Sequence, residues 1–168
     1  MEFISKNVKE TQKIAADLAR KIIKTKNGTV VALEGELGAG KTVFVKGFVK
    51  TLGIKSKIKS PTFVLMKKYK VPHGNYLYHL DCYRIRDHKD LKIPEFKEII
   101  HEPHNIVLIE WAERVKAIIP KKHITVHIDH ISRNKRKIQI SKSNRVPFPP
   151  TRLPKGSPRG RRESHSEQ

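Results

Sequence analysis

The chain has 168 residues, with 36 Lys or Arg against 16 Asp or Glu, a formal net charge of +20. This length suits one domain of about 100–200 residues, and no apolar run approaches the ~20 residues of a membrane-spanning helix. The single cysteine, Cys82, excludes an internal disulfide framework and a multi-cysteine zinc site. We therefore expect a basic cytoplasmic protein with an anionic partner, no membrane attachment and no disulfide partner.

The first third of the chain predicts a helix, a buried strand and a second helix. Apolar residues recur at helical spacing over 8–23. The apolar run 29–33 is typical of a strand that is buried on both faces. A glycine-rich turn follows, and a second helix is expected over 41–52, ending at Gly53.

Strands outnumber helices in the next part of the chain. The expected elements are strands over 63–71 and 76–83 forming a hairpin, a helix over 87–101 broken at Pro94, a buried strand over 106–109, and a final strand pair over 124–131 and 136–140. Alternating helices and strands predict an α/β fold, in which a mixed, mostly parallel sheet is flanked by helices.

Composition changes sharply after residue 140. Residues 141–168 contain five of the ten prolines, seven basic residues and two acidic residues, but only three large apolar side chains. So little apolar surface cannot offset the entropy of ordering the segment. We therefore expect a single folded domain over 1–140 and a disordered, basic Pro/Ser/Arg-rich tail over 141–168.

Residues 35–42, GELGAGKT, match the phosphate-loop pattern G-x-x-x-x-G-K-[ST] at every fixed position. Its glycines let backbone amides face phosphate, its lysine reaches the β- and γ-phosphates, and its last hydroxyl binds Mg²⁺. The predicted nucleotide-binding residues here are Gly35, Gly38, Ala39, Gly40, Lys41, Thr42 and Val43. The chain lacks an Asn-Lys-x-Asp box for guanine, which favours ATP as the nucleotide.

Two acidic residues follow probable strands. Glu110 comes directly after the apolar run 106–109, and Asp81 follows the segment 76–80. Taken alone, each acid could equally be an ordinary solvent-exposed residue at the end of a strand, with no role in binding. Together with a phosphate loop they favour a metal site, since phosphoryl transfer needs a carboxylate near the metal. Thr42, Asp81 and Glu110 are the predicted Mg²⁺ residues.

Four segments in this order resemble the TsaE (YjeE) family, the P-loop ATPase of bacterial tRNA threonylcarbamoyladenosine (t6A) biosynthesis. They are the phosphate loop, SPTF at 60–63, HLDCYR at 79–84 and LIEW at 108–111, and the likeness spans roughly residues 5–140. The resemblance implies a P-loop NTPase-like fold and a weak, partner-dependent ATP hydrolase. It also implies action with TsaB and TsaD on adenosine 37 of tRNAs that read codons beginning with A. The tRNA would then be an indirect partner, contacted through the complex with TsaB and TsaD.

The same resemblance implies residue roles. Those implied to be catalytic are Lys41, Thr62, Asp81 and Glu110, and those implied to lie near the nucleotide, besides the loop, are Thr11 and Trp111. Ser60 falls with Thr62 in a switch-like loop. The segment 132–136 departs from the Gly-Arg pattern of the family, so Arg133, Lys135 and Arg136 all stay open as nucleotide contacts.

Two other functions fit parts of the sequence. The basic composition allows a nucleic-acid-binding module whose P-loop is only regulatory, but few aromatic residues are interleaved with the basic ones, as a single-strand binder requires. A small-molecule kinase is the other alternative, although the chain shows no arginine-rich lid for an acceptor. Transfer of the γ-phosphate to a small acceptor instead of water would identify a kinase.

Overall fold

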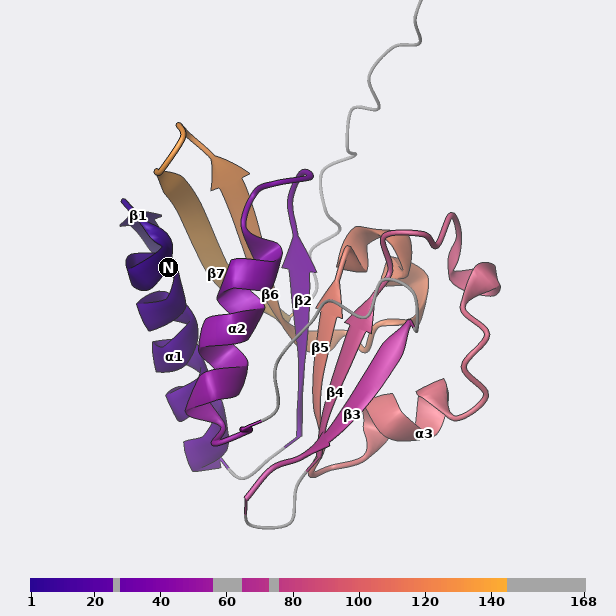
Figure 1. Cartoon of the computed structure of the whole chain (residues 1–168). Helices are drawn as coiled ribbons and strands as arrows, with labels where there is room; N and C mark the ends of the chain where they lie inside the picture. Colours follow the sequence, from indigo (N-terminus) through magenta and orange to yellow (C-terminus); the bar gives the residue numbers. More distant parts are fainter. Residues whose placement is uncertain (26–27, 56–64, 73–75, 145–168) are drawn as a thin grey trace, which may run out of the picture.

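Seven strands form one sheet, with strand order β1-β7-β6-β2-β5-β4-β3 (Figure 1). The computed structural model describes residues 1–25, 28–55, 65–72 and 76–144. The strands are β1 (Glu2–Ser5), β2 (Thr29–Glu34), β3 (Met66–Lys70), β4 (Tyr76–Asp81), β5 (Ile106–Glu110), β6 (Lys122–His130) and β7 (Arg136–Asn144). The helices are α1 (Val8–Thr25), α2 (Lys41–Thr51) and α3 (Phe96–His101), with short 3-10 turns η1 (His88–Asp90), η2 (Ala112–Arg114) and η3 (Lys116–Ile118).

The centre of the sheet is parallel and its margins are antiparallel. β2 pairs in parallel with β5 on one side and β6 on the other, and β4 pairs in parallel with β5. β3, β7 and β1 are added by antiparallel pairing. The apolar strands β2 and β5 are buried along almost their whole length, as expected for strands covered on both faces. The predicted mixed α/β fold is confirmed.

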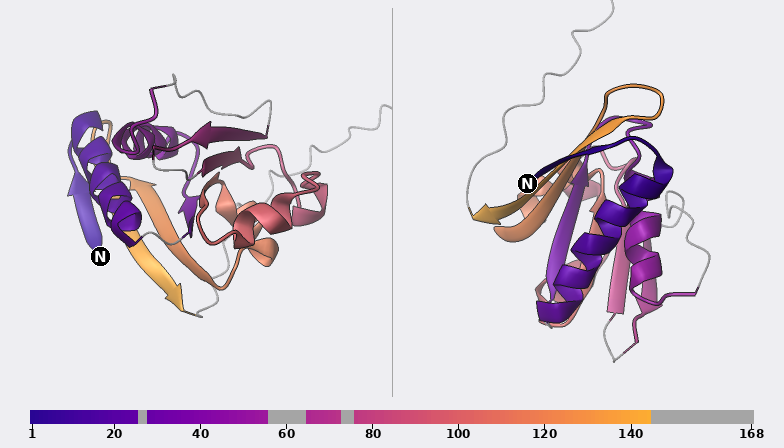
Figure 2. Two further views of the ribbon diagram at one scale, coloured as in Figure 1. Left: turned by 90° about the horizontal axis from the view of Figure 1, so that it is seen from below. Right: turned by 90° about the vertical axis from the view of Figure 1, so that its left-hand side faces the viewer.

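Helices cover both faces of the sheet (Figure 2). α1 and α2 pack with β2 side chains into one apolar cluster, and α3 packs into a second cluster on the opposite face. The two large helices approach closely at Gly47, where a Cβ atom would lie 2.6 Å from the Gln12 Cα atom. None of the helices in the described ranges is long and apolar enough to cross a bilayer.

Three local predictions differ from the structure. β1 was not predicted, because its four residues are stabilised by pairing with β7 and carry no pattern of their own. The helix expected over 87–101 is reduced to η1 and α3. Residues 141–144, assigned to the tail, extend β7 through backbone pairing with β6, which needs no apolar side chains. The rest of the predicted tail lies outside the described residues.

Candidate functional site

The phosphate loop lies at the carboxyl edge of the parallel strands, between β2 and the first residue of α2 (Figure 1). Gly35 and Gly40 have φ of 132° and 109°, in the region that favours glycine. A Cβ atom on Gly35 would also collide with the carbonyl of Ile128. The backbone of the loop therefore requires glycine at both positions, as the motif predicts.

Lys41 is buried at the start of α2 and folds back over its own loop. Its Nζ atom donates to the carbonyl oxygens of Gly35 at 2.6 Å and Glu36 at 2.9 Å. The same nitrogen lies 3.7 Å from the centroid of the Trp111 ring. Burial lowers the pKa of Lys41, although nearby carboxylates, Glu113 first among them, oppose that shift. The ammonium therefore lies beside the loop, and its hydrogen-bond partners are neutral carbonyl oxygens of the loop itself.

Glu110 ends β5 and joins the loop to the neighbouring strand. One carboxylate oxygen accepts a hydrogen bond from the Thr42 hydroxyl at 3.0 Å. The other oxygen lies 2.8 Å from Nε2 of His79, a fully buried residue of β4. Both oxygens are therefore held, and the carboxylate is fixed against the first turn of α2. The sequence assigned His79 no role.

Asp81 lies beside Glu110, since the two are register partners in the parallel pair of β4 and β5. Asp81 is buried, and its Oδ1 atom accepts from the backbone N–H of Tyr83 at 2.9 Å. Within the described part of the chain no group of three or more His, Cys, Asp or Glu residues could hold a metal ion. One hydroxyl with two carboxylates suits Mg²⁺, which keeps several waters and takes phosphate oxygens as ligands.

Trp111 follows Glu110 in the left-handed conformation, with φ 59° and ψ 43°. For a bulky residue this backbone costs about 1–2 kcal/mol, and it redirects the chain from β5 into η2. The turn places the indole beside Lys41, 5.2 Å from the Tyr83 ring and 5.1 Å from the Arg114 guanidinium. Residues with a strained backbone such as that of Trp111 cluster at functional sites, where the strain holds a side chain in one position.

One more residue that the sequence did not single out, Glu113, also lies at the site. Glu113 is half-buried, and burial raises the pKa of its carboxyl group. Among the described residues its Oε2 atom has no hydrogen-bond partner. Glu113 lies in η2, three residues after Glu110, and this closeness in sequence was an available signal.

The segment 132–136 reaches the loop through Arg136. A Cβ atom on Gly40 would lie 3.2 Å from Nε of Arg136, so this guanidinium lies against the phosphate loop. Its Nη1 atom donates to the Arg133 carbonyl at 3.3 Å. Of the three basic residues left open, Arg136 is therefore the one that the structure places at the loop.

The remaining predicted residues have different outcomes. Thr11 is buried in α1, and its hydroxyl contacts are with Ser5 Oγ at 2.8 Å and the Asn7 carbonyl at 3.3 Å, not with the loop. Ser60 and Thr62 lie outside the described residues. Burial raises the pKa of the Cys82 thiol to about 12, which agrees with a structural cysteine.

Comparison with known proteins now decides the family. The model of the family described as "Threonylcarbamoyl adenosine biosynthesis protein TsaE" matches residues 5–138. The chain belongs to the TsaE family. The resemblance inferred from the four sequence segments is thereby confirmed.

TsaE relatives match over most of the chain. A Rickettsia typhi protein named tRNA threonylcarbamoyladenosine biosynthesis protein TsaE is 37% identical over 81% of this chain and 91% of its own length. The protein of that name from Haemophilus influenzae is 36% identical over 63% of this chain and 66% of its own length. The crystal structure of Bacillus subtilis YdiB superposes with a TM-score of 0.68 at 32% identity, covering 86% of each chain.

Proposed function

We propose that this TsaE chain hydrolyses ATP with Mg²⁺ and thereby supports threonylcarbamoylation of adenosine 37 in tRNAs that read codons beginning with A. The names of the relatives support the pathway. The observation that carries the hydrolytic part is the 3.0 Å hydrogen bond between Thr42 and Glu110 at the head of a glycine-rich loop. It joins the metal-binding hydroxyl of the motif to a buried carboxylate.

The loop and α2 supply the phosphate site. Backbone amides of the loop and the amino-terminal end of α2 favour anions. Lys41 would exchange the carbonyls of Gly35 and Glu36 for β- and γ-phosphate oxygens, which bind an ammonium more strongly because they carry charge. Arg136 would add a second cation beside Gly40.

Thr42, Asp81 and Glu110 would hold the metal and the attacking water. The Thr42 hydroxyl donates its hydrogen bond to Glu110, which leaves the oxygen lone pairs of Thr42 free for Mg²⁺. When bound, Mg²⁺ neutralises charge on the β- and γ-phosphoryl oxygens. Asp81 and Glu110 lie side by side at the strand ends and would orient water for in-line attack on the γ-phosphate. Lys41 then stabilises the charge that spreads over that phosphate.

TsaB and TsaD are the proposed partners, and the cytoplasm is the proposed location. We expect hydrolysis by the isolated chain to be slow and to increase when these proteins bind. The partners would catalyse the modification of tRNA itself, because the residues described at this site suit phosphoryl transfer. A reconstituted tRNA modification assay with and without this chain tests that role.

Replacement of Lys41 tests the hydrolytic proposal. We expect Lys41→Ala to lower phosphate release from Mg·ATP about 10²–10³-fold, the usual loss when one preorganised charge donor is removed. Lys46→Ala, on the exposed face of the same helix, is the matched control and should retain the wild-type rate. Equal rates in wild type and Lys41→Ala would refute the site. Transfer of the γ-phosphate to a small acceptor in preference to water would replace hydrolysis by kinase activity.

A further inference from the structure

One stretch of the chain holds much of its excess positive charge. Residues 37–80 contain nine lysines and neither Asp nor Glu. Their net charge of +9 compares with +20 for the whole chain of 168 residues. The phosphate loop uses only Lys41 of these nine. The other lysines have no acidic neighbour along the sequence, and the proposed ATP chemistry gives them no task.

Three of these lysines, Lys55, Lys68 and Lys70, line one hollow beside the edge strand β3, and we call them the basic surface. The hollow, of about 450 Å³, lies between the end of α2 and β3. Its lining contains no acidic residue, and its members are Gly53, Ile54, Lys55, Lys68, Tyr69, Lys70, Val71 and Pro72.

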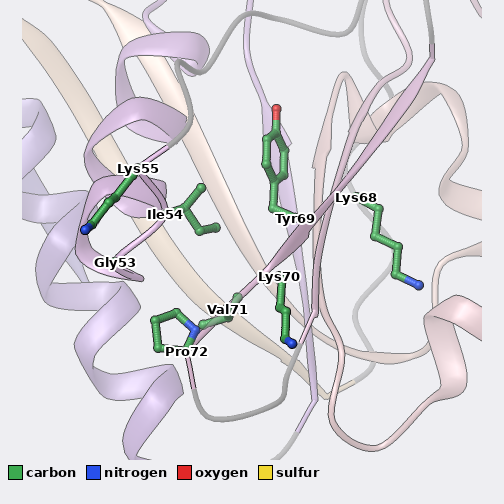
Figure 3. A pocket seen from close by; sticks show the side chains of 8 residues that line it. All are labelled: Gly53, Ile54, Lys55, Lys68, Tyr69, Lys70, Val71 and Pro72. Carbon is green, nitrogen blue, oxygen red and sulfur yellow. The ribbon is translucent and has the colours of Figure 1, made fainter.

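The charged ends around the hollow point in different directions (Figure 3). The side chains of Lys55 and Lys68 extend away from each other, and Nζ of Lys68 lies 4.0 Å from the centroid of the Tyr76 ring. Among the described residues, none of Lys55, Lys68 and Lys70 forms an ion pair with a carboxylate. A single small anion would meet one ammonium only, whereas a polyanion with spaced charges would meet several.

We propose that the basic surface binds the phosphate backbone of RNA. Lysine contacts to phosphate are independent of base sequence and gain free energy by releasing counterions. The choice of RNA among polyanions rests on the proposed function. The hollow is separate from the phosphate loop, because α2, about 16 Å long at 1.5 Å per residue, lies between Lys41 and Gly53 (Figure 1).

Protection of a sheet edge explains only part of this charge. Lysines on an edge strand discourage pairing with another chain, and β3 is such a strand. Lys55 follows α2 and is not part of β3, so edge protection does not account for it. A ligand that contacts both segments accounts for all three lysines.

The test is tRNA binding by the full chain over a salt series. Fluorescence anisotropy with an unmodified tRNA transcript would compare wild type with a Lys55→Gln, Lys68→Gln, Lys70→Gln triple variant between about 50 and 200 mM salt. Each lost phosphate contact lowers the slope of log K against log salt by about 0.7–0.9. We expect the slope to become shallower by about 2–3 and the affinity to fall at least about tenfold.

A triple variant of equal charge provides the control. Lys9, Lys13 and Lys97 are exposed on α1 and α3, and their replacement by Gln should leave the slope close to that of the wild type. An equal loss in both variants, or no tRNA binding by the wild type, would overturn the proposal. Binding of polyglutamate at this surface in place of tRNA would overturn it as well, by indicating an acidic protein partner.

ATP hydrolysis measured on the same samples separates the two proposals. Both triple variants should hydrolyse ATP like the wild type, since neither changes the phosphate loop. Loss of tRNA binding with hydrolysis intact supports the basic surface as a distinct site. A wild-type chain that binds tRNA through this surface but does not hydrolyse ATP would refute the proposed function and leave the surface supported.

Discussion

The two ends of α2 use lysine in opposite ways. At its start, Lys41 is buried, and Asp81, Glu110 and Glu113 all act on its charge. Beyond its end, Lys55 and Lys70 are exposed and have no acidic residue beside them in the lining of the hollow. The first arrangement holds one ammonium group in a defined place, by hydrogen bonds to the carbonyl oxygens of Gly35 and Glu36. The second creates an extended positive field, which attracts a charged chain without fixing its register.

This contrast divides the expected effects of mutation. Changes among Lys41, Thr42 and Glu110 should alter catalysis and leave attraction to a polyanion intact. Changes among the surface lysines should do the reverse. A variant that affected both properties equally would show that the two ends of α2 form one site.

The largest effect is expected at Glu110. Glu110→Gln keeps the size of the side chain and an acceptor for Thr42, but it removes the charge that faces the metal site. We expect ATP turnover to fall about 10²–10³-fold, with ATP affinity within a few-fold of wild type and tRNA affinity unchanged. Phosphate release and calorimetric ATP titration measure the two quantities. Unchanged turnover would make Glu110 a structural residue.

An intermediate effect is expected at Arg136. Its guanidinium lies against Gly40, and Arg136→Gln should weaken ATP binding about tenfold, the equivalent of one charge-assisted hydrogen bond. Arg133→Gln, on the same β6–β7 turn, is the control and should bind ATP like the wild type. The reverse order of affinities would assign the nucleotide contact to Arg133.

The smallest effect concerns His127 of β6. Glu34, 3.7 Å from Nδ1, and Asp129, 2.9 Å from Nε2, raise the pKa of His127 to about 8. Because the folded state favours the charged form, this contribution is complete below pH about 6.5 and is lost as pH rises through about 8. His127→Gln should therefore flatten the decline in Tm over that window. An NMR titration that places this pKa near 6.5 would contradict the ion-pair arrangement.

Much of the site was predictable because it is built from local patterns. The glycines of residues 35–42 and the acids at strand ends are each fixed by their immediate neighbours in sequence. Parallel pairing of β4 with β5 then places Asp81 beside Glu110, as expected for acids at the carboxyl ends of neighbouring parallel strands. The segments that resemble TsaE added the family, which local chemistry alone did not supply.

The features that the sequence left open or missed depend on contacts between distant segments. Arg136 reaches Gly40 because β6 pairs with β2 and carries the β6–β7 turn to the phosphate loop. The position of β6 in the sheet is not readable from its own residues. The left-handed backbone of Trp111 is likewise held by its surroundings, since an isolated tryptophan disfavours it. The proximity of Lys55 to Lys68 and Lys70 also required the fold.

Trp111 provides the most direct test of the central claim, which is that ATP binds through Lys41. It is the only tryptophan in the chain, and its ring lies 3.7 Å from the Lys41 ammonium. We predict a saturable change in tryptophan emission when Mg·ATP is added, because phosphate draws Lys41 away from the indole, and no such change in Lys41→Met. ATP binding measured by calorimetry without any change in Trp111 emission would contradict the account.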